Sequence, residues 1–476
     1  MMMKKRNNKC LAYGLMTLIS LLGVVACKTP QATLPNDTVK ASMPVATADT
    51  VTAIPLWRDF FKDPTLCALI DTALANNQDL KITLQEMAIA KSNILAKRGQ
   101  MLPSVTANVS AGASKAGRYT AEGAGNVGTE ITPGHNVPNV VPDFAPNLHL
   151  DWSVDLWNQL NSTKRAAVER YLASEEGQRT IKSQLVADVA ENYYALLALD
   201  NKLDIMQQYI ALQKKAVQIA RVQKEADADT QLAVEKFESE LAKASAEEYQ
   251  LRQAITETEN NLNLLLGRYP TPITRNKNVL MEQSLPNTLQ AIPASLLLHR
   301  PDIVAAEHQL RAAKWDVEAA RKAFLPSLNI SASLGLDAFN PKYLLQLPKS
   351  LAFSVVGGLT APLINKKAIQ ANFDQANALQ LEALYNYDKT LLTAYSEMST
   401  LQARARNLAQ YQVLKKKQND ALTRAVSVSQ QLYNYNRATY LEVLDSERDQ
   451  LDCQVELVDT QLRQLSTLID LYRGFF

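Results

Sequence analysis

Apolar and polar residues alternate in two short stretches, each of which follows the tripeptide Leu-Pro-Ser. After residues 102–104 the odd positions from 105 to 111 are Val or Ala, and the even positions are Thr, Asn or Ser. After residues 325–327 the even positions up to 336 are Leu, Ile or Ala. This period of two predicts strands with one apolar and one polar face, and a partner strand follows each loop. The predicted strands are 103–119, 147–157, 326–339 and 350–364.

Two longer stretches, residues 147–269 and 363–476, contain no proline and place apolar residues at helical spacing. Leu185, Val189 and Leu196 follow this spacing in the first stretch, and Leu391 and Met398 follow it in the second. A single helix over 158–224 would be about 100 Å long, more than a compact domain needs. We therefore predict coiled-coil hairpins at 158–266 and 365–473, with turns near residues 225–229 and 435–438.

A shorter helix precedes each strand pair, and the two halves of the chain repeat one another. Asp63-Pro64 opens a helix to about residue 101, and Arg300-Pro301-Asp302 opens its counterpart at 301–325. A shift of 223 residues places Arg98 on Arg321 and one Leu-Pro-Ser on the other without a gap. The sequence thus predicts a duplication, with a first repeat at 63–285 and a second at 286–476.

Four predicted strands per chain are too few to close a membrane barrel, whose smallest known form has about eight. Beyond residue 26 no run of 18 uncharged apolar residues occurs, so no transmembrane helix is predicted, and a spanning chain would need a β-barrel. Because open sheet edges are not tolerated in lipid, copies should pool their strands, and a trimer would supply twelve. The alternative is a soluble four-stranded sheet.

The N-terminus alters the charge balance. Lys4, Lys5, Arg6 and Lys9 precede an apolar run that ends at Cys27, which predicts a secretory signal at 1–26. The small residues before Cys27 resemble a bacterial lipobox, so we expect Cys27 to be lipidated and residues 27–62 to form a tether. Removal of four cations changes the net charge from +2 to about −2, and nucleic-acid binding loses its compositional support.

No motif indicates catalysis, a cofactor or a metal site. The four histidines lack ligand spacing, and Cys67 and Cys453 are expected to be free thiols, although a bridge between them is left open. Residues 123–128 match a dinucleotide fingerprint but lack the strand and helix that this fingerprint requires. They lie in a loop between two predicted membrane strands, and nine of the 15 glycines fall in 103–157 and 326–364.

Several motifs resemble TolC-like outer-membrane factors, specifically the lipoprotein channel subunits of resistance-nodulation-division (RND) efflux pumps. The Arg-Pro-Asp block is the most specific of them, and together they span nearly the whole mature chain. The matching segments are Trp57, Phe60-Phe61, Asp63-Pro64, Leu69-Ile70, Ala73-Leu74, Val154-Asp155-Leu156-Trp157, Arg300-Pro301-Asp302-Ile303, Ala305-Ala306-Glu307, Gln309-Leu310-Arg311-Ala312-Ala313, Phe324-Leu325-Pro326-Ser327 and Tyr440-Leu441-Glu442-Val443-Leu444-Asp445.

The resemblance implies a mainly α chain with a transmembrane β-barrel, in which a homotrimer forms a twelve-stranded barrel and an α-helical tunnel. It implies an outer-membrane, lipid-anchored protein that extends into the periplasm and contacts outer-membrane lipid. It also implies a passive conduit rather than an enzyme, with a periplasmic adaptor (membrane fusion protein) and an inner-membrane RND transporter as partners. Cargo stays open among drugs, metal ions, solvents and siderophores.

Glu442 and Asp445 are three residues apart and share a helix face near the second hairpin's tip. In a symmetric trimer each would form a ring of carboxylates, which favours cations. The resemblance implies a periplasmic gate at Glu442, Asp445 and Arg448, with Tyr433 helping to hold the tip closed. Gln231 stands where relatives often have Asp, which puts the contact that locks some relatives closed in doubt.

Asn436 replaces the turn glycine that relatives have, and the first hairpin's turn lacks this glycine as well. Docking of the adaptor could differ for this reason. Two alternative functions stay open: a non-conducting periplasmic coiled-coil lipoprotein, and the export duct of a type I protein secretion system.

Overall fold

The computed structural model describes residues 30–31, 57–227, 230–282, 297–362, 364, 366–435 and 437–474. The predicted signal at 1–26, Cys27 and most of the tether lie outside these residues. The chain forms two compact units. Of the described residues, those within 1–35, 89–171 and 308–384 form unit 1, and those within 36–88, 172–307 and 385–476 form unit 2.

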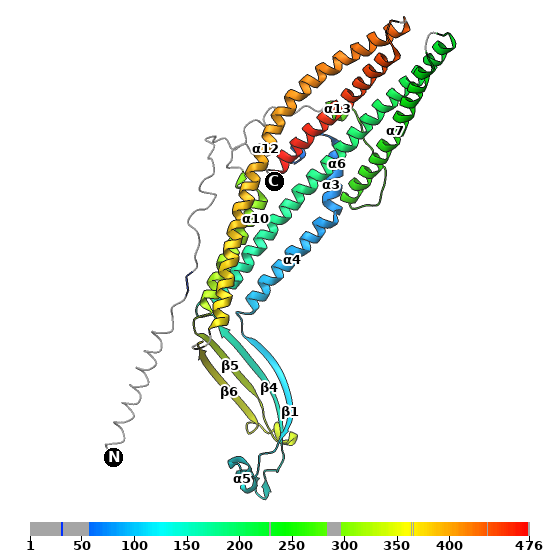
Figure 1. Ribbon diagram of the computed structural model, residues 1–476. Coiled ribbons are helices and arrows are strands. Elements are labelled where there is room, and N and C mark those ends of the chain that lie inside the picture. Colours follow the sequence, from blue (N-terminus) through cyan, green and yellow to red (C-terminus); the bar gives the residue numbers. More distant parts are fainter. Residues whose placement is uncertain are drawn as a thin grey trace. The chain divides into compact units, whose positions relative to one another are not determined.

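The elements follow one another in two similar series (Figure 1). The first series is α2 (Trp57–Phe60), α3 (Pro64–Asn76), α4 (Gln78–Gly99), β1 (Ser104–Ser114), α5 (Ala121–Gly128), β2 (Glu130–Thr132), β3 (His135–Asn136), β4 (Val141–Val154), α6 (Gln159–Glu225), α7 (Gln231–Leu265) and α8 (Val279–Glu282). The second is α10 (Pro301–Lys322), β5 (Ser327–Leu336), α11 (Pro341–Leu344), β6 (Leu351–Thr360), α12 (Lys367–Asn434) and α13 (Tyr440–Arg473).

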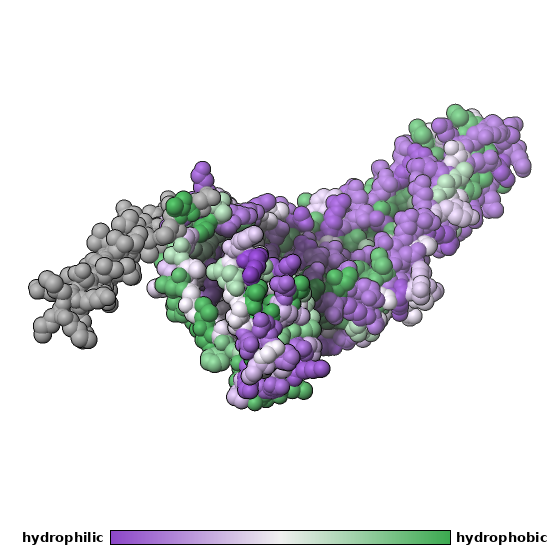
Figure 2. All heavy atoms as spheres, turned by 90° about the horizontal axis from the view of Figure 1, so that it is seen from below, coloured by the Kyte–Doolittle hydropathy of each residue, from purple (hydrophilic) through white to green (hydrophobic). Residues whose placement is uncertain are grey.

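Unit 1 contains an antiparallel sheet with the strand order β1-β4-β5-β6. The register places the apolar positions of all four strands on one face, because Leu148 pairs with Leu334 and Leu334 pairs with Phe353. This face is bare: Val109 is 82% exposed and Phe353 76% exposed. In Figure 2 hydrophobic surface gathers around the strands, whereas the long helices are mostly hydrophilic. The outer edges of β1 and β6 have no partner strand among the described residues.

Two tryptophans fasten the sheet to the Leu-Pro-Ser turns. The indole nitrogen of Trp152 donates to the carbonyl of Met101 at 3.1 Å, and that of Trp157 donates to the carbonyl of Pro326 at 2.7 Å. Tryptophan with one apolar and one hydrogen-bonded end suits the boundary between lipid and water. Strands of 10 to 14 residues are long enough to cross a bilayer.

The strand boundaries differ from the prediction mainly at β4, which begins at Val141 rather than at 147. Pro142 and Pro146 lack the N–H that a strand residue donates, but both are tolerated for a geometric reason. Phe144, between them, donates its N–H to Ala338 on the β5 side, so the nitrogens of both prolines face that side and the pairing with β1 is intact. The loop before β4 also differs, since it contains α5 and the β2–β3 ladder.

In unit 2 the predicted long helix after Asp63 is interrupted at Asn77, which separates α3 from α4. The Asn77 amide donates to the carbonyl of Leu265 at 3.0 Å, and its oxygen accepts from the N–H of Leu80 at 3.0 Å. Gly267 lies close by with φ +66, where a Cβ would come within 2.5 Å of the Asn76 carbonyl. Because the break depends on contacts with the end of α7, the local pattern of α3 and α4 does not predict it.

The core of unit 2 lies where α3, α6, α7 and α13 pack. Its largest fully buried side chains include Leu66, Ile70, Tyr193 and Leu197. The Tyr193 hydroxyl donates to Asp63 at 2.6 Å, and Asp63 also caps α3 by accepting from the N–H of Thr65. The N-terminal Asp-Pro motif is thereby tied to the middle of α6. Cys67 and Cys453 are both free thiols.

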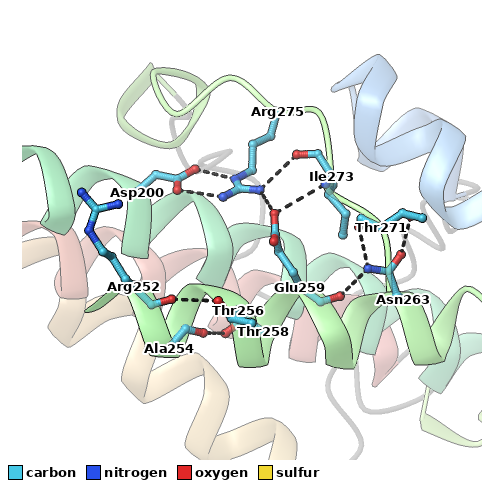
Figure 3. Close-up of polar contacts among 10 residues, drawn as sticks. All are labelled: Asp200, Arg252, Ala254, Thr256, Thr258, Glu259, Asn263, Thr271, Ile273 and Arg275. Carbon is cyan, nitrogen blue, oxygen red and sulfur yellow. Dashed lines mark hydrogen bonds and ion pairs between the residues drawn. The ribbon is translucent and has the colours of Figure 1, made fainter. Parts of the chain in front are cut away.

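The loop that follows α7 is held by an arginine (Figure 3). The Arg275 guanidinium binds both carboxylate oxygens of Asp200 on α6, at 2.5 and 2.9 Å, and also pairs with Glu259 on α7. Asn263 holds the same loop by donating to the carbonyl of Thr271 at 2.8 Å.

Among the described residues, no helix is both long and apolar enough to cross a membrane.

Candidate functional site

The residues singled out in the sequence lie at the tips of the two helical hairpins, where α6 passes into α7 and α12 into α13. The first turn reverses without glycine because Asp227 adopts φ +50, a conformation that Asp tolerates. In the second turn the N–H of Arg437 donates to the carbonyl of Leu432 at 2.8 Å. Asn436 lies outside the described residues.

Glu442 caps the start of α13. One carboxylate oxygen accepts from the N–H of Thr439 at 2.6 Å and from the Thr439 hydroxyl at 3.0 Å. The backbone hydrogen bond, followed by the hydroxyl bond, holds the pKa of Glu442 below its ordinary value. The side chain is exposed, so Glu442 is an ionised carboxylate whose reach is limited by its own capping contacts.

Asp445 lies one turn further along the same face and is also exposed. It makes no hydrogen bond or ion pair with any residue that the structure describes. Val443 and Leu444, on the other side of the helix, are buried. Leu444 packs in a small cluster with residues of α6 and α7, and the rings of Phe237 and Tyr440 lie 6.3 Å apart. This packing fixes which face of α13 presents its carboxylates.

Arg448 forms an ion pair with Glu240 on α7, so it joins the second hairpin to the first. Glu240 is buried and also accepts a hydrogen bond from the Tyr209 hydroxyl at 3.2 Å. Burial by itself would raise the pKa of Glu240, but the hydrogen bond and charge of Arg448 outweigh it and lower the pKa. Within one chain, therefore, Arg448 binds Glu240 and makes no hydrogen bond or ion pair with Glu442 or Asp445.

The remaining two predicted residues, Gln231 and Tyr433, lie on different hairpins. Gln231 is exposed at the first position of α7, and its amide donates to Glu235 on the same helix at 2.7 Å. Tyr433 is buried on α12, with 9% of its surface exposed. Contacts between the hairpins include the ion pair of Arg448 with Glu240.

Sequence reasoning missed two buried carboxylates in this region, Glu240 and Glu447. Glu447 is 4% exposed and accepts hydrogen bonds of 2.8 Å from Gln213 on α6 and of 2.8 Å from Gln430 on α12. The signal was present in the spacing, because Glu447 follows Leu444 and Val443 in the apolar stripe of α13. A charged residue in such a stripe predicts a buried polar contact rather than a solvated face.

A groove runs beside these residues between α12 and α13. It is lined largely by small and apolar side chains, with Glu442 and Arg424 as its charged members: Ala421, Arg424, Ala425, Val428, Ser429, Leu432, Ala438 and Glu442. The described residues contain no cluster of three or more metal-ligating side chains. The tips thus combine exposed carboxylates, a buried inter-hairpin network and a shallow groove.

Comparison with known proteins connects this arrangement to a family. A family model described as outer membrane efflux protein matches residues 69–268 and 292–474. The chain is 27% identical over 424 residues to the solvent efflux pump outer membrane protein SrpC of Pseudomonas putida, covering 89% of this chain and 87% of that protein. It is 26% identical over 419 residues to the cation efflux system protein CusC of Escherichia coli K12, covering 87% of each.

The fold is similar to that of solved membrane proteins. A crystal structure of a membrane protein from Pseudomonas aeruginosa superposes with a TM-score of 0.83 at 24% identity, and the match covers 94% of this chain and all of that one. The similarity extends over both the sheet and the long helices, since so little of either chain is left out.

Proposed function

Because this chain belongs to the outer membrane efflux protein family, we propose that it conducts solutes passively across the outer membrane as the channel component of a tripartite pump. The observation that carries the proposal is the sheet of unit 1, with its bare apolar face and two unpaired edges. Such a sheet is stable in lipid only when its edges are paired. No catalytic residue and no cofactor is part of this function.

Three copies would close the sheet. One chain supplies four strands of the 10 to 14 residues that a membrane requires, and twelve strands are enough to enclose a lumen. The polar face, which carries Ser, Thr and Asn, would line that lumen. Helices α6 and α12, of 67 and 68 residues, would continue the conduit as a tunnel into the periplasm.

Lipidation of Cys27 would add a second attachment to the membrane. A single acyl chain gives only marginal binding by itself, so the closed sheet would supply most of the anchoring. The support for this step is the lipobox-like sequence that ends at Cys27.

The tips would form the periplasmic gate. Glu442 and Asp445 are exposed on one face of α13, and threefold symmetry would turn each into a carboxylate ring that favours cations and narrows the opening. Arg448 would keep the two hairpins of a subunit together through Glu240. Tyr433 would contribute by packing, and Gln231 would lie at the rim.

The groove between α12 and α13 suits docking of a helical partner, because its small and apolar lining admits the ridge of another helix. We assign it to a periplasmic adaptor that links the channel to an inner-membrane RND transporter. Relatives are named for solvents, cations and pyoverdine, so one scaffold serves different cargoes. The transporter, rather than this chain, would select the cargo.

A planar lipid bilayer tests the proposal directly. Purified wild-type protein should give small single-channel currents, and Asp445→Ala and Glu442→Ala should each raise the conductance. Glu86→Gln on α4 serves as the control, because Glu86 is an exposed carboxylate on another element, and its currents should match the wild type. Absence of current from every variant would refute the channel, and would favour a structural coiled-coil lipoprotein.

A further inference from the structure

We propose that Glu447 is a positioning residue for the gate: its buried carboxyl ties α13 to α6 and α12 within one subunit, and proton uptake there tightens the closed arrangement. The proposal rests on the proposed gate at Glu442 and Asp445. Glu447 itself is 4% exposed and therefore cannot touch the passing solute.

Helical geometry explains how Glu447 acts on the gate. Successive residues of an α-helix are rotated by about 100°, so Glu447 points about 200° away from Asp445. When Gln213 and Gln430 hold Glu447 in the core at 2.8 Å each, the face with Asp445 is turned outward. Loss of the tie would free the first turns of α13 to rotate or separate.

The charges around Glu447 do not balance. Gln213 and Tyr209 face it from α6 and Gln430 faces it from α12. Arg448 is the next residue on α13 but binds Glu240 on α7. Since Arg448 is paired with Glu240, the buried carboxylate of Glu447 has no ion pair among the described residues. A proton on Glu447 would remove the unpaired charge, and a neutral buried group is far less costly than an isolated ion.

Two observations indicate that the tied arrangement binds a proton at Glu447 more readily than an exposed glutamate does. Burial raises the pKa of Glu447, and the hydrogen bonds from Gln430 and Gln213 offset this only in part. The amide oxygen of Gln213 is buried without a hydrogen-bond partner among the described residues. A protonated carboxyl, or an amide in its place, can donate to this oxygen after a rotation of the side chain.

The sign of the pH effect follows from linkage. A group whose pKa is higher in the tied state than in the open state binds its proton more tightly when tied, so acid favours the tied state. Glu447 titrates above the ordinary value for glutamate, whereas the pKa of Glu442 is lowered. A change of conductance at pH values above the ordinary pKa of glutamate would therefore report Glu447 rather than Glu442.

The test uses full-length protein in a planar bilayer across that range. Wild-type channels should open more as pH rises. The ratio of open to tied channels should change by at most tenfold for each unit by which the pKa of Glu447 differs between the tied and the open state. Glu447→Gln should remain closed and lose most of this pH dependence, and Glu447→Ala should conduct more at every pH. Glu86→Gln should keep the wild-type profile. A wild-type pH profile in Glu447→Gln would overturn the proposal.

A second measurement keeps the tie testable without any current. Amide hydrogen exchange of residues 440–451 in the detergent-solubilised protein should be several-fold faster in Glu447→Ala than in the wild type, and unchanged in Glu86→Gln. Equal exchange in all three proteins would refute the tie. If exchange responds to Glu447→Ala while no variant conducts, including Asp445→Ala, the channel function fails and the tie stands.

Discussion

Glu240 is a buried carboxylate whose ion pair with Arg448 is one of several contacts between the two hairpins of a subunit. Arg448 supplies the charge and Tyr209 a hydrogen bond. Removal of one partner from such a pair leaves the other buried and unsatisfied. The resulting loss of stability is larger than the stability that the intact pair contributes. The network is therefore a sensitive point of the tips.

Arg448→Ala is expected to loosen the tips and to raise the channel's conductance. The free energy that holds the two hairpins together should fall by about 1 to 2 kcal/mol. A hydrogen bond to a charged group is a strong one, but the arginine is half exposed, which limits its contribution. Single-channel recording measures the effect. The exchanged pair Glu240→Arg with Arg448→Glu should recover part of the closed state. If Arg448→Ala conducts like the wild type and the exchanged pair changes nothing, Arg448 does not hold the tips together.

Glu442 has two separable roles, as a helix cap and as a charge at the opening. Glu442→Gln keeps a side chain that can accept from Thr439 but removes the charge, whereas Glu442→Ala removes both. We expect both variants to conduct more than the wild type, and only Glu442→Ala to speed hydrogen exchange in the first turn of α13. Equal exchange in the two variants would argue against the cap.

At this scale the sequence predicted the shared face of Glu442 and Asp445, because spacing along one helix determines it. It did not predict the pairing of Arg448 with Glu240, which are 208 residues apart. Nor did it reveal Glu447, whose partners lie on two other helices. Contacts of this kind depend on how helices pack, and a single sequence does not contain that information.

At the scale of elements, the loop after α7 is held by charge as well as by the buried side chain of Ile273. Arg275 is 14% exposed and binds carboxylates from both α6 and α7. Arg275→Ala would leave Asp200 and Glu259 without their cation, at a cost of about 3 kcal/mol. Limited proteolysis within residues 268–278 should become several-fold faster.

Arg275→Lys provides the matched variant for this loop. It keeps the charge but loses the bidentate contact with Asp200. The rate of proteolysis should therefore lie between that of the wild type and that of Arg275→Ala. Cleavage at the wild-type rate in Arg275→Ala would show that the loop is held by other contacts.

Periodicity predicted the four main strands and the four long helices because each repeats its pattern over ten or more residues. It failed where a partner element decides the outcome. The break at Asn77 requires the end of α7, and the extension of β4 through Pro142 and Pro146 requires that both proline nitrogens face away from β1. The short α5 has too few residues for a period to be detected.

At the scale of the whole molecule, the duplication predicts how neighbouring copies join. Val105 and Leu328 are equivalent positions of the two repeats. Val105 pairs with Leu150 in the first hairpin of strands, and Leu328 pairs with Leu359 in the second. Leu150 and Leu359 are therefore equivalent as well.

The junction between the two repeats then serves as a template for the junction between copies. Leu150 lies opposite Ala332 within the chain, and the equivalent of Ala332 in the first repeat is Val109. Leu359 of one copy should thus lie opposite Val109 of the next. Both side chains belong to the exposed apolar face, which agrees with this register.

The most direct test of a conduit built by three copies is a disulfide across this junction. In a protein with Cys67→Ala and Cys453→Ala, the substitutions Val109→Cys and Leu359→Cys should yield a covalent trimer on oxidation, because opposed residues have Cα atoms about 5 Å apart. Val109→Cys with Val355→Cys, offset by roughly 13 Å, should not cross-link. Monomers from the first pair, or trimers from the offset pair alone, would contradict the account.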